Sequence, residues 1–209
     1  MKLQLSLLAA ALLTIGAGTV HANSVDLTVT GTITPPSCTI QLSNGGAIDL
    51  GQVDLATLSD VADNPLTVQN VDVLITCASA AKVATSVVED RPGTASTVGD
   101  DNFGLNNTAG GNPIGFYKVF AENGVADTVA TPVIASSNLS TWTSPAGGTP
   151  VAHIGNKFTA VGTTAGGPAS ATTVGWSLRI EPTIAPSTSL ALTGAQAIDG
   201  QMTLTLNYL

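Results

Sequence analysis

Side chains suited to catalysis are few in this chain of 209 residues, and they form no familiar catalytic pattern. His153 lies in an apolar stretch, where packing or exposure to solvent is a simpler expectation than catalysis. Glu89 and Asp90 lie beside an expected loop, and we expect water to solvate both carboxylates. No nucleophile-elbow, zinc-protease or phosphate-loop motif occurs. We therefore expect neither an enzyme nor a cofactor.

Two loop segments hold residues that could bind a ligand. Asp100, Asp101 and Asn102 offer the oxygen ligands that calcium prefers, but without the spacing of an EF-hand. Solvation is the simpler expectation, and we expect no metal site, with loop calcium as the alternative. Trp176 follows a strand alternation and is expected in the core. Trp142 lies in a loop rich in serine, proline and glycine, where it contacts a ligand or packs over the end of the fold.

Two cysteines, Cys38 and Cys77, lie on the apolar faces of expected strands. An exported chain with a single pair of cysteines most simply forms one disulfide. Closing a loop of this size should stabilise the fold by roughly 3–4 kcal/mol in the chain-entropy model. The alternative, a pair of metal-binding thiolates, lacks the further ligands that a closed zinc site needs.

The first 22 residues have the features of a signal peptide. Lys2 gives a basic start, residues 5–15 form an apolar run, and residues 20–22 match a signal-peptidase site. The apolar run is shorter than the about 20 residues that cross a bilayer. We therefore expect cleavage after Ala22 and an exported chain that begins at Asn23, with an N-terminal core helix as the alternative.

The composition limits the kinds of partner. Without Lys2, five basic residues face fourteen acidic ones, so we expect no nucleic-acid partner. Charged residues make up 10% of the chain, well below the usual quarter or so, and small and β-branched residues are abundant instead. That mixture is typical of β-structure joined by long polar loops.

Short alternating or valine-rich segments, bounded by turn residues, predict a single all-β sandwich without helices of useful length. Asn123-Gly124 is expected to turn a hairpin, and Pro182 to end the strand that precedes it. Residues 93–113 are expected to form a long surface connection. The expected strands cover residues 38–42, 47–50, 68–77, 82–89, 114–121, 128–135, 151–154, 157–161, 174–180, 189–193 and 200–209.

The two ends of the expected exported chain alternate most clearly. Residues 24–33 place an apolar face opposite a face of aspartate and threonine, which is the period-two pattern of a strand with one buried face. Residues 35 and 36 are prolines and interrupt any ladder. The apolar face at the start is formed by Val25, Leu27, Val29, Gly31 and Ile33, and the one at the end by Met202, Leu204, Leu206 and Tyr208.

These two ends, together with the cysteines, resemble a chaperone–usher pilus (fimbrial) subunit, of a less-characterised single-domain branch. The alternating segment has a glycine, Gly31, on its apolar face seven positions before the first cysteine, Cys38. The last strand has a penultimate tyrosine, Tyr208, and Cys77 lies where the disulfide partner of that family would. The resemblance implies a signal peptide (1–22), a donor-strand extension (23–36) and an incomplete immunoglobulin-like β-sandwich (37–209).

The resemblance also implies a function. Such a subunit polymerises by donor-strand exchange, in which the extension of one copy completes the sandwich of the next. The implied partners are a periplasmic pilus chaperone, an outer-membrane usher and neighbouring subunits, and the implied location is the cell surface. In that family basic residues of the chaperone hold the terminal carboxylate, here that of Leu209. The alternative is a self-contained, exported β-sandwich that binds a carbohydrate or a surface, with residues 24–33 as an ordinary edge strand.

Overall fold

The computed structural model of the chain describes residues 27–32, 37–154 and 157–209. The chain divides into two compact units, Met1–Thr34 and Pro35–Leu209. In the first unit, the described residues 27–32 belong to no strand or helix. The predicted signal peptide lies outside the described residues, as do Val25, Ile33 and the two prolines.

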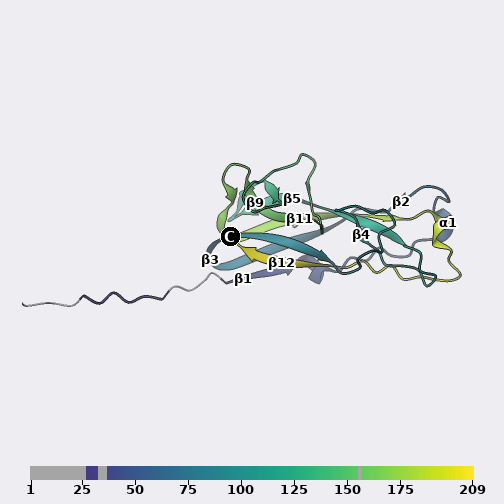
Figure 1. The fold of residues 1–209 in the computed structure, drawn as a ribbon, viewed down its shortest axis with the longest axis horizontal. Coiled ribbons are helices and arrows are strands. Elements are labelled where there is room, and N and C mark those ends of the chain that lie inside the picture. The colour runs from purple at the N-terminus through teal and green to yellow at the C-terminus, as the bar shows by residue number, and fades with distance from the viewer. Residues whose placement is uncertain (1–26, 33–36, 155–156) are drawn as a thin grey trace, which may run out of the picture. The chain divides into compact units, whose positions relative to one another are not determined.

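The second unit is all-β, as the sequence predicts: strands make up 47% and helices 6%. All pairings between its described strands are antiparallel (Figure 1). The strands are β1 (Cys38–Leu42), β2 (Asn64–Pro65), β3 (Gln69–Glu89), β4 (Phe103–Gly104), β5 (Gly115–Ala126), β6 (Val129–Ala130), β7 (Val133–Ser136), β8 (Thr149–Pro150), β9 (Phe158–Thr163), β10 (Gly167–Pro168), β11 (Ser170–Ile184) and β12 (Met202–Tyr208); short helical turns are η1 (Ser43–Gly46), η2 (Leu55–Thr57) and α1 (Ser187–Leu190).

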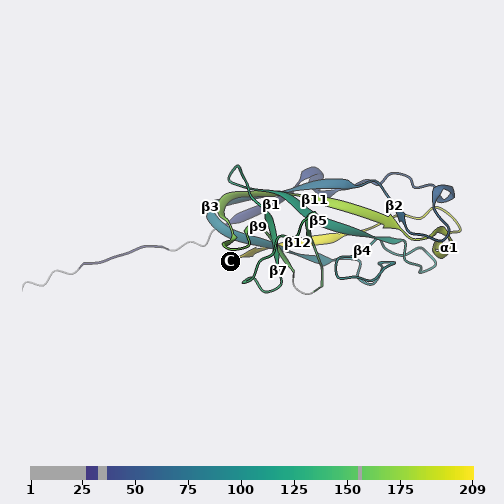
Figure 2. The same cartoon turned by 90° about the horizontal axis from the view of Figure 1, so that it is seen from above.

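Strand β3 organises this unit because it pairs with different strands along its length. In its first half, Ile75 faces Ile40 of β1 on one side and Val174 of β11 on the other. In its second half, Thr85 faces β12 on one side and β9 on the other. The sequence predicts two strands here, but residues 78–81 are small and include no glycine or proline, so the chain stays extended through the bend. Figures 1 and 2 show the bend beside the C-terminus.

The bend curls the sheet around one hydrophobic core. Strands β1, β11, β5 and β4 continue from the first half of β3, and β12, β9 and β7 continue from its second half. Buried side chains from both parts meet in one cluster, among them Val73, Ile75, Val83, Val161 and Trp176. The prediction that Trp176 lies in the core is confirmed. None of the described residues forms a helix long and apolar enough to cross a membrane.

The predicted hairpin lies four residues further along than expected. Strand β5 runs through Asn123-Gly124, where two residues oppose Trp176 of β11 alone. Asn123 has a φ of 56°, and the pair forms a β-bulge rather than a turn. The chain instead turns at Asp127 and Thr128, whose φ values of 44° and 76° suit a two-residue hairpin loop.

Five other local predictions are wrong. Residues 93–113, expected as a surface connection, include strand β4 and the buried side chains of Phe103 and Leu105. Strand β11 continues through Pro182, whose missing N–H is tolerated while its carbonyl accepts from the amide of Leu66. Residues 189–193 form no strand, and α1 occupies residues 187–190 instead. Residues 47–50 and 151–154 also form no strand. The stretch 47–50 lies between Gly46 and Gly51, whose φ values of 78° and 68° turn the chain away from the sheet.

Candidate functional site

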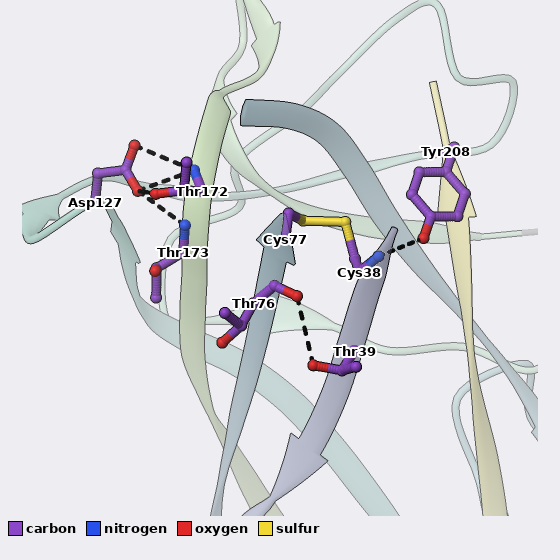
Figure 3. The surroundings of a disulfide bond; sticks show 8 residues. All are labelled: Cys38, Thr39, Thr76, Cys77, Asp127, Thr172, Thr173 and Tyr208. Atoms are coloured by element: carbon purple, nitrogen blue, oxygen red, sulfur yellow. Dashed lines mark hydrogen bonds between the residues drawn. A yellow bond between two sulfur atoms is a disulfide. The ribbon is translucent and has the colours of Figure 1, made fainter. Parts of the chain in front are cut away.

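The disulfide predicted between Cys38 and Cys77 is present and joins β1 to β3 (Figure 3). The two residues face each other directly in the β1–β3 register. Both cysteines are used in this bond, so the alternative of metal-binding thiolates is wrong. The disulfide fixes the start of β1, which otherwise pairs only with β3 among the described strands.

Strand β12 forms a second edge, since β3 is also its only partner among the described strands. The amide of Leu209 donates to the carbonyl of Lys82, and the amide of Asp90 donates to the carbonyl of Gln201. Residues that face each other in an antiparallel pair alternate between exchanging both backbone hydrogen bonds and exchanging none. Given the β12–β3 register, the odd-numbered residues of β12 bond to β3. The backbone groups of the even-numbered residues, 202 to 208, therefore point toward the open edge.

The same reasoning applies to β1. The amide of Ala78 donates to the carbonyl of Ser37, so the odd-numbered residues of β1 bond to β3. The N–H and C=O groups of Cys38, Ile40 and Leu42 then point away from β3. Both edges thus present backbone groups on residues whose side chains, apart from that of Tyr208, are half-buried and pack against the core. An antiparallel or parallel strand placed along either edge would find a row of donors and acceptors.

Tyr208 connects the two edges at one end. Its hydroxyl accepts a hydrogen bond of 2.7 Å from the amide of Cys38, the first outward-pointing group of β1 (Figure 3). The side chain is 49% exposed, unlike those of Met202, Leu204 and Leu206, which are half-buried. The sequence predicts that Tyr208 shares the apolar face of β12, and the structure adds this contact with β1.

A cleft of about 1310 Å³ opens between the segments that continue these two edges. One wall is residues 46–55, which follow β1, and the other is residues 194–201, which lead into β12, together with Met202 and Leu204 of that strand. Side chains of the core form its floor, including Val71, Leu105, Tyr117, Leu178 and Ile180. The sequence predicts a groove strand formed by Met202, Leu204, Leu206, Tyr208 and Leu209; Met202 and Leu204 line this cleft, and the other three do not. The floor residues come from four separate strands or loops, so no local pattern could have indicated them.

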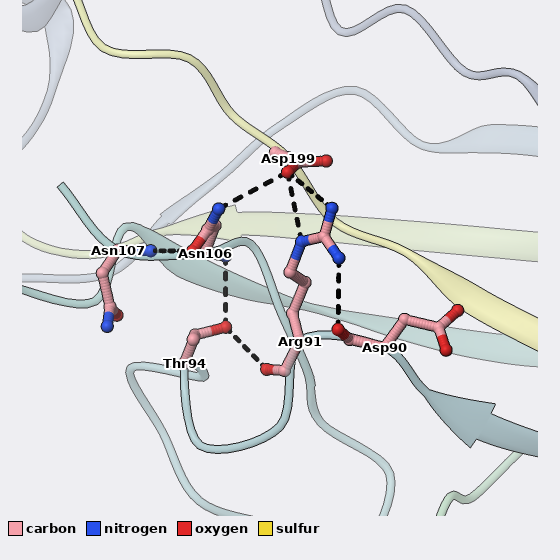
Figure 4. A network of polar contacts seen from close by, with 6 residues as sticks. All are labelled: Asp90, Arg91, Thr94, Asn106, Asn107 and Asp199. Carbon is pink, nitrogen blue, oxygen red and sulfur yellow. Dashed lines mark hydrogen bonds and ion pairs between the residues drawn. The ribbon is translucent and has the colours of Figure 1, made fainter.

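The wall before β12 is fixed by a polar network (Figure 4). The guanidinium of Arg91 donates to the Asp199 carboxylate at 2.7 and 3.1 Å, and Asn106 donates to the same oxygen at 3.4 Å. Gly200 packs so closely that an added Cβ would lie 2.8 Å from Tyr117 and 2.9 Å from Leu105. These contacts hold the wall against the loop that follows β3.

The charged groups that line the cleft are all acidic. Asp49, Asp54 and Asp199 contribute to its lining, and no lysine or arginine does among the residues that the structure describes. The floor is less polar than the walls. Burial raises the pKa of Tyr117 well above its ordinary value, and the nearby carboxylates of Glu89 and Asp90 raise it further. The phenol therefore stays neutral, and the floor presents an apolar surface with a polar tip.

The described part of the predicted donor strand is highly exposed. Leu27 is 89% exposed and Val29 is 86% exposed, and an added Cβ on Gly31 would have nothing within 4 Å. Isolated exposed apolar residues are common, but two large ones on one alternating face form a surface that other β-edges can bind. Val25 and Ile33 complete this predicted face and lie outside the described residues.

The remaining candidate ligand-binding and charged residues make contacts within the fold. Trp142 is buried against Ile134 and Ala160, so it packs rather than presenting its ring to a ligand. Asp101 forms an ion pair with Lys118 at 3.4 Å. No cluster of three histidine, cysteine or acidic residues that could hold a metal occurs in the described parts of the chain. The predicted solvation of Glu89 is wrong, because its side chain is only 7% exposed.

Comparison with known proteins adds one match. Residues 27–113 match the model of a family described as a protein of unknown function (DUF1120). The matched stretch begins in the exposed alternating segment, includes β1, the disulfide, β3 and β4, and ends just before β5. No curated protein matches the chain.

Proposed function

We propose that this chain is a structural subunit of a surface fibre, a fimbrium, and that its copies join by strand donation. The observation that carries the proposal is the pair of strand edges, β1 and β12, whose outward backbone groups include those of Leu42, Met202 and Leu204, which line a cleft with an apolar floor. In this proposal the sandwich is immunoglobulin-like and lacks one strand. The alternating segment of residues 24–33 from a neighbouring copy supplies it.

The energetics favour such an exchange. Four large apolar side chains of the extension, Val25, Leu27, Val29 and Ile33, would leave water on binding. At roughly 1.5–3 kcal/mol each, their burial contributes on the order of 6–12 kcal/mol as an upper estimate. Backbone hydrogen bonds along both edges add to that value. Gly31 fits a shallow part of the cleft because it has no side chain to clash.

An unfilled edge of this kind also needs protection before assembly. Open edges and exposed apolar surface invite aggregation. In the proposal a periplasmic chaperone fills the cleft with one of its own strands and holds the terminal carboxylate of Leu209. An outer-membrane usher then passes the subunit to the growing fibre, where the extension of another copy replaces the chaperone strand.

A matched pair of substitutions in the extension tests the proposal. Leu27→Asp places a charge on the apolar face of the extension, whereas Thr28→Asp places the same charge on the opposite face. We expect Leu27→Asp to abolish joining and Thr28→Asp to leave it close to wild type. Gly31→Arg should block subunit joining while leaving chaperone capture intact. The readout is the length distribution of fibres sheared from cells that also express the chaperone and usher.

The acceptor side offers an equivalent pair. Leu204→Asp puts a carboxylate into the cleft, while Thr205→Asp points it to solvent. Only Leu204→Asp should prevent capture of both the chaperone strand and the extension. Equal effects of the two substitutions would contradict the assigned cleft. If residues 23–209, expressed without a chaperone, form a stable soluble monomer with every strand paired, the assembly proposal is wrong and a self-contained binding sandwich is favoured.

A further inference from the structure

His153 and Glu89 form a buried pair that strand donation does not by itself require. The side chain of Glu89 is 7% exposed and that of His153 is 11% exposed. Nδ1 of the imidazole lies 3.4 Å from Oε2 of Glu89. The imidazole also packs against the ring of Phe103, with 4.9 Å between centroids. Buried ionisable groups of this kind persist only when they are paired or hydrogen-bonded.

The surroundings of the ring specify its protonation. Nε2 lies 3.0 Å from the backbone carbonyl oxygen of Asn102, which can only accept a hydrogen bond. Nδ1 faces the Glu89 carboxylate, which when ionised can also only accept. A neutral imidazole carries a single N–H, so one of its nitrogens would direct a lone pair at an oxygen. The imidazolium, with two N–H groups, satisfies both contacts and pairs with the carboxylate.

The pair is linked to the cleft through short contacts. The other oxygen of Glu89, Oε1, accepts from the amide of Gly104 at 2.5 Å, directly before the floor residue Leu105. Phe103, which packs on His153, stacks on Tyr117 of the floor with 5.2 Å between ring centroids. Glu89 is also the residue of β3 that faces Met202 at the start of β12. One buried pair thus contacts the floor and the β12 wall together.

We propose that the protonated His153–Glu89 pair positions the floor and the β12 wall of the cleft, so that capture of a strand depends on pH. The inference rests on the proposed strand donation. Loss of the second imidazole proton removes the charge-assisted contact and leaves the buried carboxylate with the Gly104 amide alone. Binding of a strand therefore weakens at a pH high enough to remove the second imidazole proton.

The neighbouring charged side chains do not take the place of Glu89 or His153 in this pair. Asp90 accepts from Thr203, Arg91 pairs with Asp199, and Lys118 pairs with Asp101, so each of these groups has another partner. The titratable and charged groups on the elements packed around His153 are Glu89, Asp90, Arg91, Asp100, Asp101, Tyr117, Lys118 and Asp199. Asp100 touches His153 through its backbone carbonyl, which accepts the amide of His153.

The protonation is tested by nitrogen NMR of the imidazole in the exported chain, with His153→Gln to assign the signal. At about pH 6, slightly below the ordinary histidine value of about 6.5, we expect two similar nitrogen shifts, the pattern of an imidazolium. At higher pH the shifts should separate. Widely separated shifts at about pH 6, the pattern of a neutral ring, would overturn the inference.

The coupling to the cleft is tested with a synthetic peptide of residues 24–33. Its dissociation from the wild-type chain should quicken about tenfold between about pH 6 and about pH 8, a change of about 1.4 kcal/mol. The dissociation rate of the peptide from His153→Gln should not change with pH. Lys118→Gln removes a nearby charge outside the pair, and its dissociation rate should change with pH as that of the wild type does. A wild-type rate independent of pH would overturn the coupling.

Failure of the coupling can be told apart from failure of strand donation. If the peptide binds at no pH, the proposed function fails. Hydrogen exchange at the amides of Leu105 and Thr203, which both bond to backbone carbonyls, is corrected for intrinsic rates and then decides the coupling by itself. The coupling is supported if these amides are better protected at about pH 6 than at about pH 8 in the wild type and show no such difference in His153→Gln. Equal protection in both proteins overturns it.

Discussion

Removal of the disulfide should destabilise the protein by an amount that can be worked out from the structure. The bond joins residues 39 positions apart. In the chain-entropy model a closed loop of that size restricts the unfolded chain by about 13 cal/mol/K, which is about 4 kcal/mol at 25 °C. The double variant Cys38→Ser with Cys77→Ser should lose about this much free energy of unfolding. A typical domain has about 5–15 kcal/mol in total, so a variant of such a domain would retain about 1–11 kcal/mol.

The loss should be largest in β1. That strand is held by its ladder with β3, by the disulfide at its first residue and by the Tyr208 hydroxyl. Without the covalent bond, β1 can leave the sheet while the rest of the core stays packed. We therefore expect the amides of β1 and the Cys38–Tyr208 contact to lose protection before the amides of β11, which pairs with strands on both sides.

Urea unfolding followed by tryptophan fluorescence measures the global loss, because both tryptophans are buried. Reduced wild-type protein is the matched control and should unfold at the same midpoint as the variant. Hydrogen exchange resolved by residue reports the local loss. A decrease of less than about 1 kcal/mol, or uniform loss of protection across β1 and β11, would refute the reasoning that the bond fixes an otherwise weakly held edge.

Three further predictions concern other residues. Tyr208→Phe removes the acceptor for the Cys38 amide while keeping the ring, so we expect a loss of about 1 kcal/mol in urea unfolding and faster exchange of that amide. Hydrogen bonds from Thr172 and Thr173 lower the pKa of Asp127. The carboxylate therefore stabilises the fold above the ordinary aspartate range, and this contribution is lost as the pH falls through the lowered pKa. On acidification, the melting temperature of Asp127→Asn should fall less than that of the wild type. Burial raises the pKa of Tyr117, so the phenol ionises more readily in the unfolded chain; stability should fall as the pH rises above about 10, and Tyr117→Phe should remove part of that fall in alkaline urea titrations.

Several elements could be predicted from the sequence because their signals are local. The period-two pattern placed β1 at residues 38–42 and placed β12 within residues 200–209. The single pair of cysteines in a chain with export features indicated the disulfide. In each case the information lies within a few neighbouring residues or in a simple count. Alternation reports directly which side chains face the core.

Other features depended on partners far away in the chain. The Asn123-Gly124 pair has the composition of a turn, but the pairing of β5 with β11 makes it a bulge. Glu89 was predicted to be solvated because its neighbours in sequence belong to an expected loop. Its burial comes from His153 and Gly104, which lie 64 and 15 positions away.

The sequence by itself determined which faces of β1, β12 and residues 24–33 are apolar, and that Cys38 would pair with Cys77. Tertiary structure alone decided that β3 bends to pair with both parts of the sheet, and so left one side of β1 and one side of β12 without a partner among the described strands. It also decided which side chains form the cleft floor. The physical reason is that alternation specifies the orientation of a side chain, whereas an unpaired edge and a cavity depend on which distant strands occupy the neighbouring positions.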